Sequence, residues 1–167
     1  IADYVVKNNI WTVNEYVYLY STPVAVIRNH DVYHIQADHL NTPRTITKSD
    51  GSLVWKWENI EVFGNNLPND NLGASIFKFN LRFMGQYWDE EKGSSYNYYR
   101  DYASGMGRYL QSEPIGLEGG INTYGYVSAN SLKYVDPTGE VPIIPILLGA
   151  GFGASVNALN VYTSAVK

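Results

Sequence analysis

Short runs in which apolar and polar side chains alternate constrain the fold of this chain more than any other feature. The clearest run, FKFNLRF at residues 77–83, places three Phe and one Leu on one face and Lys78, Asn80 and Arg82 on the other. This two-residue period is that of a β-strand with one buried and one exposed face. Turn residues separate such runs, and the 3.6-residue period of an amphipathic helix is nearly absent. The sequence therefore predicts an all-β fold built as an antiparallel meander.

The strands of this meander can be placed by their turns. Residues 16–20 and 24–27 flank Ser-Thr-Pro and predict a hairpin, and Asp-Gly at residues 50–51 marks a second hairpin turn. Residues 1–14 are expected to be mostly extended, and residues 65–75 to form a polar loop. Further strands are expected at residues 33–37, 45–47, 54–58, 77–83 and 95–102.

Composition narrows the range of functions. The 15 Tyr and 4 Trp suit half-buried sheet surfaces, and the absence of Cys excludes disulfides, thiol catalysis and thiolate metal sites. A net charge of −4 without any run of Lys or Arg argues against nucleic acid as a partner. We interpret His39, beside Asp38, as a structural histidine because no suitably placed nucleophile accompanies it. No metal or cofactor is expected.

The chain divides into three parts by composition. Residues 1–95 are predicted to form a β-strip, residues 96–140 an irregular region rich in Gly, Asn and Tyr, and residues 141–167 an apolar tail. The tail has no charged side chain from position 141 to position 166, which leaves packing against the sheet and contact with a membrane as alternatives. The chain begins at Ile1 without a leader pattern, so we expect it to be a piece of a longer protein.

Five motifs occur in a fixed order before a closing Asp-Pro-Thr-Gly at residues 136–139. They are YHIQADHLNTPR at 33–44, WKWE at 55–58, FGN at 63–65, LRFMGQYWDE at 81–90 and GRYLQSEPIGL at 107–117. Together they resemble YD repeats followed by the Rhs repeat-associated core domain, as in polymorphic toxins and the related toxin-complex C proteins. The resemblance covers roughly residues 16–140.

The resemblance first implies an architecture. In this family, YD repeats wind into a hollow β-sheet shell, the core domain closes one end as a plug, and a variable C-terminal toxin lies inside. The chain would then supply the last strands of the wall, the plug and the start of the variable part. The implied partners are the rest of the shell and the C-terminal toxin. Further candidates are an immunity protein, a secretion-system component and, through free sheet edges, other copies of the chain. The implied localisation is that of an exported bacterial effector.

The resemblance also implies cleavage of the chain by itself. The family cuts shortly after its DPxG signature, which on this sequence is formed by Asp136, Pro137 and Gly139. The cut would fall between Glu140 and Val141.

Two acids and an arginine are the implied catalytic residues. The family's Arg–Asp pair falls on Arg100 and Asp101, and its second acid falls on Glu113. Two carboxyls that share a site do not ionise together easily, so one can act as a base toward water while the other donates a proton. Asp101 is the expected base and Glu113 the expected acid. Arg100 alternates with Asp101 along its strand, so it is expected to orient the second acid or the cleaved segment instead.

Two departures from the family pattern favour slow or absent cleavage. Glu113 replaces the usual Asp, and Glu140 replaces the usual Leu. A misplacement of about 1 Å can cost roughly a hundredfold in rate. The alternative hypothesis is a non-catalytic shell or plug module that shields the apolar tail. In that case Asp101 and Glu113 are ordinary strand and turn acids, and Arg100 is a cross-strand ion-pair partner. A third hypothesis makes residues 141–166 membrane-active.

Overall fold

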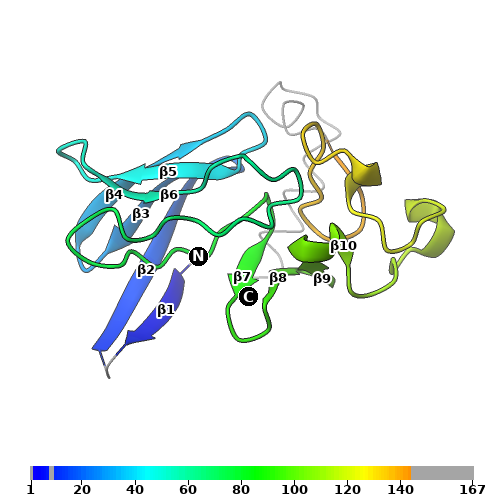
Figure 1. Ribbon diagram of the computed structural model, residues 1–167, viewed down its shortest axis with the longest axis horizontal. Coiled ribbons are helices and arrows are strands. Elements are labelled where there is room, and N and C mark those ends of the chain that lie inside the picture. The colour runs from blue at the N-terminus through cyan, green and yellow to red at the C-terminus, as the bar shows by residue number, and fades with distance from the viewer. Residues whose placement is uncertain (1, 8–9, 144–167) are drawn as a thin grey trace.

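Two antiparallel sheets of six and four strands form the regular structure of the molecule (Figure 1). The computed structural model describes residues 2–7 and 10–143. Within these ranges the only helical segments are three short 3₁₀ turns, so the predicted all-β antiparallel fold is confirmed. These turns are η1 Ser104–Met106, η2 Gly116–Gly119 and η3 Val127–Ala129.

The six-stranded sheet is a meander in which each strand pairs with the next along the chain. Both predicted hairpins are present, around the Ser-Thr-Pro turn and the Asp-Gly turn, and the extended N-terminal segment contributes the first two strands. In sheet order the strands are β1 Ala2–Lys7, β2 Ile10–Leu19, β3 Thr22–Arg28, β4 Asp31–Ala37, β5 Pro43–Thr47 and β6 Leu53–Lys56.

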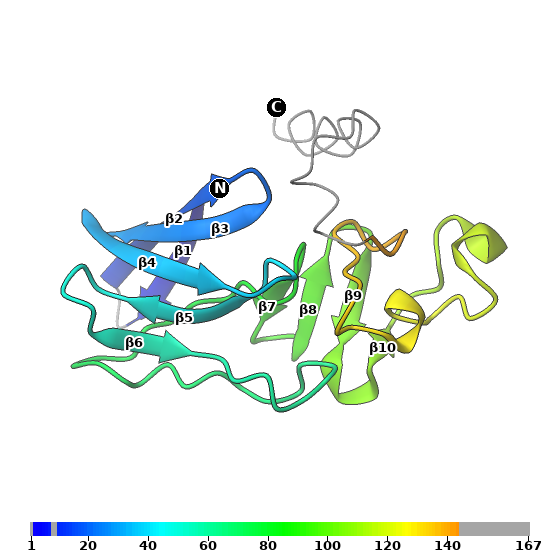
Figure 2. The same cartoon turned by 90° about the horizontal axis from the view of Figure 1, so that it is seen from above.

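The four-stranded sheet lies beside the larger one, and residues 110–125 extend from its far side (Figure 2). A single strand predicted at residues 95–102 is wrong, because the chain reverses at Tyr98 and Tyr99 to form a hairpin. Tyr98 has a φ of +58°, and the N–H of Tyr99 donates to the carbonyl of Thr138 at 3.2 Å. A loop distant in sequence therefore supports the turn. In sheet order the strands are β10 Arg108–Tyr109, β9 Arg100–Ala103, β8 Ser94–Asn97 and β7 Tyr87–Asp89.

The strand predicted at residues 77–83 is wrong in its hydrogen bonding, and its predicted alternation holds only in part. All three of its Phe side chains are buried, but Leu81 is half-buried and Arg82, predicted on the polar face, is buried as well. Within this run the backbone joins no ladder and makes a single isolated bridge, between Leu81 and Tyr87. Its first residue is tied by a bond from the N–H of Phe77 to the carbonyl of Asp70 at 2.7 Å. The run is therefore an extended segment that places its Phe rings in the core but does not pair as a strand.

One aromatic core joins the two sheets. The ring centroid of Phe79 lies 5.0 Å from that of Trp55, and Phe83 lies 5.5 Å from Trp57 and 5.9 Å from Tyr126. The Phe79–Trp55 contact is edge-on and the Phe83–Tyr126 contact is stacked, which are the arrangements that aromatic rings prefer, while Phe83 and Trp57 are tilted against each other. The core continues across the boundary predicted between positions 95 and 96, which falls inside β8.

Residues 136–139, which we call the closing loop, return to the hairpin of β8 and β9. An isolated bridge between Val135 and Ile143 joins the two ends of the segment that carries the loop. Gly85 approaches the loop so closely that a Cβ at this position would lie 2.2 Å from the carbonyl oxygen of Pro137. No helix within residues 2–7 and 10–143 is long and apolar enough to cross a membrane. From position 144 onward, the predicted tail lies outside the described residues.

Candidate functional site

Arg100 is the centre of a buried polar cluster. It begins β9, where alternation turns its side chain to the buried side and leaves Asp101 on the other. Its guanidinium lies 3.6 Å over the ring of Tyr109. Its Nε donates to the carbonyl of Gly139, and its Nη1 to the carbonyl of Thr123 at 3.3 Å. One cation thus ties the closing loop to β9.

Two carboxylates share this guanidinium. Nη2 of Arg100 lies 2.7 Å from Oε2 of Glu113 and 3.2 Å from Oδ2 of Asp136. None of the three side chains is more than 4% exposed. Removing one member of such a buried group leaves an uncompensated charge, which is strongly destabilising. The three side chains of the cluster therefore depend on one another.

The carboxylate of Asp136 organises the closing loop. Its Oδ1 accepts the N–H groups of Gly139 and Glu140 at 2.9 and 3.0 Å, and its Oδ2 accepts the hydroxyl of Tyr109 at 2.9 Å. Asn97 donates from Nδ2 to the Tyr109 hydroxyl and to the backbone carbonyl of Asp136. Both carboxylate oxygens are thus fully used in holding the loop. Sequence reasoning placed Asp136 only in the cleavage signature and missed its contact with Arg100.

Glu113 is less completely satisfied than Asp136. Its Oε1 is buried and has no hydrogen-bond partner among the described residues. Burial raises the pKa of Glu113 above its ordinary value of 4.5 and the charge of Asp136 raises it further, while Arg100 and a backbone hydrogen bond from Ile115 lower it. All three side chains line a cavity of about 480 Å³. Glu113 is the group in this cluster with the strongest physical reason to hold a proton.

The predicted pairing of Asp101 with Glu113 is not present. Oδ2 of Asp101 accepts a bond from Nε2 of Gln111 at 3.0 Å, and Oδ1 lies 3.6 Å from Nζ of Lys92. Within the described ranges no hydrogen bond or ion pair joins Asp101 to Glu113. The reason is the alternation of side chains along β9: because Glu113 meets Arg100, it lies on the opposite face from Asp101.

The predicted cleavage junction lies at the edge of the cluster. Gly139 is bonded to Arg100 through its carbonyl, and the N–H of Glu140 is bonded to Asp136. Val141 is 51% exposed, and the next residue, Pro142, lines the cavity. The sequence-predicted residues that the structure brings together are therefore Arg100, Glu113, Asp136, Gly139 and Glu140.

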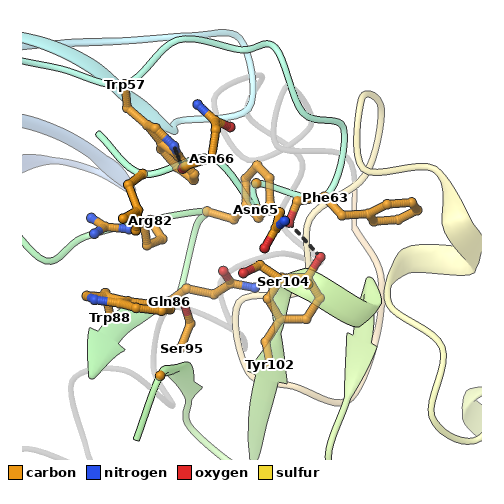
Figure 3. A pocket seen from close by; sticks show the side chains of 15 residues that line it. Trp57, Phe63, Asn65, Asn66, Arg82, Gln86, Trp88, Ser95, Tyr102 and Ser104 are labelled. Carbon is orange, nitrogen blue, oxygen red and sulfur yellow. Dashed lines mark hydrogen bonds between the residues drawn. The ribbon is translucent and has the colours of Figure 1, made fainter. Parts of the chain in front are cut away.

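A second cavity, of about 350 Å³, has a different character. Figure 3 shows the guanidinium of Arg82 between the rings of Trp57 and Trp88, at 5.4 and 5.7 Å from their centroids. The hydroxyl of Tyr102 donates to the carbonyl of Phe63 at 2.9 Å. The residues that line this cavity include no Asp or Glu. Of these two cavities, only the one at Arg100 therefore brings acidic side chains together.

The described residues contain no group of three or more His, Asp or Glu side chains that could hold a metal ion. The cluster can therefore perform acid–base chemistry through the carboxyl of Glu113, whose pKa is raised. Beside it, Arg100 binds the backbone carbonyl of Gly139.

The same fold occurs in part of the chain in solved structures of TcdB2-TccC3. A crystal structure of TcdB2-TccC3 matches with a TM-score of 0.64 and 18% identity, over 83% of this chain and 7% of that chain. A structure of TcdB2-TccC3 without its hypervariable C-terminal region gives a TM-score of 0.61 and 19% identity, over 77% and 6%. At this identity the likeness concerns the fold alone: an antiparallel β-segment of a much larger chain.

Relatives at the level of sequence are more similar. The chain is 40% identical over 123 residues to Toxin protein Tse5 of Pseudomonas aeruginosa, covering 70% of this chain and 8% of that protein. It is 34% identical over 113 residues to Double-stranded DNA deaminase toxin A of Burkholderia cenocepacia, covering 65% and 8%. It is 36% identical over 98 residues to Probable deoxyribonuclease RhsA of Dickeya dadantii, covering 59% and 7%. No family model matches the chain.

These similarities confirm the resemblance indicated by the motifs. The chain belongs with the Rhs-associated proteins and corresponds to their repeat-associated core segment. It spans 8% or less of the length of each of these three relatives.

Proposed function

We propose that this chain is the closing segment of an Rhs-type polymorphic toxin and holds the polypeptide that leads to a C-terminal effector. Two relatives are named as toxins, one of them a DNA deaminase toxin. The observation that carries the proposal is the anchoring of the closing loop, whose backbone is bonded to Arg100, Tyr99 and the carboxylate of Asp136. Buried bonds of this kind fix the point from which the downstream chain departs.

The second part of the proposal is that the chain is cut between Glu140 and Val141. Water adds its hydroxyl to the carbonyl carbon of Glu140, the C–N bond breaks, and the nitrogen of Val141 takes up a proton. Glu113 is the proposed proton donor, supported by its raised pKa and its unpartnered oxygen among the described residues. Arg100 is the proposed positioning residue, supported by its bond to the carbonyl of Gly139.

Two carboxyls are candidates for the base. Asp101 is the candidate from the family pattern, although it faces Gln111 and Lys92. Asp136 is the candidate from the cluster, because it shares Arg100 with Glu113, although its oxygens already accept bonds. Substitution of each by Asn distinguishes the two.

Intact-mass spectrometry of the purified 167-residue chain over time tests the cleavage. We expect fragments 1–140 and 141–167, and no fragments from Glu113→Gln. Glu118→Gln is the matched control, because Glu118 is an exposed acid of the neighbouring turn η2, and this variant should be cut like the wild type. Among the two base candidates, the one whose Asn variant stays intact while still showing the native circular dichroism spectrum is the base.

If the chain is not cut, the proposed function of holding the downstream polypeptide can still be tested. A chain that stays intact rules out the cleavage proposal, and the holding function then remains, as a non-catalytic plug. A Glu113→Gln variant that is cut at the wild-type rate rules out Glu113 as the proton donor. The holding function predicts slow hydrogen exchange at the N–H groups of Gly139 and Glu140, lost in Asp136→Ala because their acceptor is removed. Fast exchange at both groups in the wild type would rule out holding as well.

The wider context is also a proposal. The similarity to proteins named as toxins supports export from a bacterial cell, with a shell, a C-terminal toxin and an immunity protein or secretion component as partners. Among the described strands, β1 lies at the end of the six-stranded sheet and pairs only with β2. Its outer edge is where a preceding strand or another copy would pair.

A further inference from the structure

Glu113 lies against a position that carries no side chain. A Cβ built on Gly119 would lie 2.5 Å from Cγ of Glu113, 2.7 Å from its Cδ and 2.8 Å from its Oε2. These are the three atoms nearest to that Cβ, and all belong to one side chain. The space that a side chain at position 119 would use is therefore occupied by the carboxyl arm of Glu113.

The atom at the end of this arm is the one that meets Arg100. Oε2 of Glu113 lies 2.7 Å from Nη2 of Arg100, in a group that is at most 4% exposed. Protein interiors are close-packed, so a methyl group on residue 119 cannot be added without moving the arm. The carboxyl would then leave the guanidinium, while Asp136 would keep its own contact at 3.2 Å.

The backbone at position 119 does not itself require glycine. Gly119 lies in η2 and does not have a positive φ, in contrast to Gly116, the first residue of that turn, and Gly120, which follows it. Alanine is therefore allowed by the backbone, and the steric cost of Gly119→Ala comes from the contact with Glu113.

We propose that Gly119 is a positioning residue, which lets the longer acid at position 113 place its carboxyl on Arg100. Glutamate at this position needs one methylene more than the aspartate expected from the family pattern. The empty position 119 provides that room. Only one part of this inference rests on the proposed function, namely that Glu113 acts as the acid in cleavage. The coupling between positions 119 and 113 is independent of cleavage.

A double-mutant cycle on the full chain tests the coupling. We expect Gly119→Ala to reduce the equilibrium constant for folding about tenfold in the wild type, because contacting residues couple by roughly 0.5–3 kcal/mol. In the Glu113→Ala background, where Cγ, Cδ and Oε2 are absent, Gly119→Ala should reduce the equilibrium constant for folding less than about twofold. Gly73→Ala is the matched control, because Gly73 also lacks a positive φ and its Cβ would meet Val54 only at an ordinary 3.5 Å. Gly73→Ala should change the equilibrium constant for folding less than about twofold.

The titration of Glu113 gives a second readout, which does not require Glu113→Ala to fold. In Gly119→Ala the carboxyl loses the attraction of Arg100, which lowers its pKa in the wild type, while burial continues to raise it. The midpoint of the Glu113 side-chain carboxyl, followed by ¹³C NMR, should therefore be higher in Gly119→Ala than in the wild type. An equal cost of Gly119→Ala in both backgrounds, or an unchanged or lower midpoint, overturns the proposal. An intact chain in the mass experiment bears only on cleavage.

Discussion

At the residue scale, the cluster around Arg100 combines one cation with two carboxylates that differ in how they are used. Asp136 gives both oxygens to the closing loop and Tyr109, whereas Glu113 keeps one oxygen without a partner among the described residues. Burial without full hydrogen bonding is what raises the pKa of a carboxyl. The two acids therefore have different roles, although they share one guanidinium.

Arg100→Met should be strongly destabilising. The change leaves Glu113 and Asp136 buried without their shared cation, which typically costs about 3–5 kcal/mol. Arg108→Met is the control, because Arg108 is exposed and its cation lies 5.3 Å from the ring of Tyr124. Arg108→Met should lower the free energy of unfolding by no more than about 1 kcal/mol. Urea denaturation measures both, and similar losses for the two variants would contradict the central role of Arg100.

The raised pKa of Glu113 predicts a dependence of stability on pH. The folded state holds the Glu113 proton more tightly than the unfolded state, whose pKa is near the ordinary 4.5. The stabilisation from this proton is therefore complete below pH 4.5 and is lost as the pH rises through the raised pKa. Glu113→Gln cannot titrate, so the wild type should lose stability relative to this variant over that range. Urea denaturation at a series of pH values measures the difference, and parallel curves would contradict the assignment.

At the element scale, the closing loop and the hairpin of β8 and β9 support each other. The loop supplies the acceptor for Tyr99 in the turn, and β9 supplies Arg100 for the carbonyl of Gly139. Gly139 has a φ of +77°, and a Cβ there would lie 2.6 Å from the backbone oxygen of Asn97. Two elements separated along the chain thus form one packed unit.

Gly139→Ala should therefore cost more than the same change at a glycine in open space. Gly51 has a φ of +84° and nothing within 4 Å of its Cβ position. Gly51→Ala should cost about 1–2 kcal/mol through its backbone conformation. Gly139→Ala adds a clash with rigid backbone, typically about 1–3 kcal/mol more. Thermal or urea denaturation of the two variants checks this order, and equal costs would show that the loop can move away from Asn97.

At the scale of the whole molecule, the two sheets share one core and are expected to unfold together. Phe83 contacts Trp57, which follows β6, and Tyr102 of β9. Phe83→Ala should cost about 3–5 kcal/mol, as large-to-small core changes do. Hydrogen exchange followed by mass spectrometry should show protection falling together in β5–β6 and in β8–β9. Loss in one sheet alone would indicate two separate folding units, and Leu67→Ala, at a residue 74% exposed, serves as the control.

Much of the first sheet could be predicted from local pattern. Alternation and turn residues located its hairpins, because each strand pairs with its neighbour along the chain. The run at 77–83 shows the limit of this approach. Alternation located its three buried Phe side chains, but it missed the burial of Arg82 and did not show whether the backbone finds a partner strand. The hairpin at Tyr98 and Tyr99 was missed because its turn depends on Thr138, a residue from another part of the chain.

The sequence by itself determined the all-β class, the Rhs-type motifs and the identity of the residues in the closing loop. Only the tertiary structure decided which acids meet. Asp101 follows Arg100 directly, and this separation by one residue turns the two side chains to opposite faces of β9. Glu113 and Asp136 reach Arg100 from 13 and 36 residues away because the chain folds back twice over the same buried surface. Local pattern fixes the direction of a side chain, whereas its partners depend on contacts that are distant in sequence.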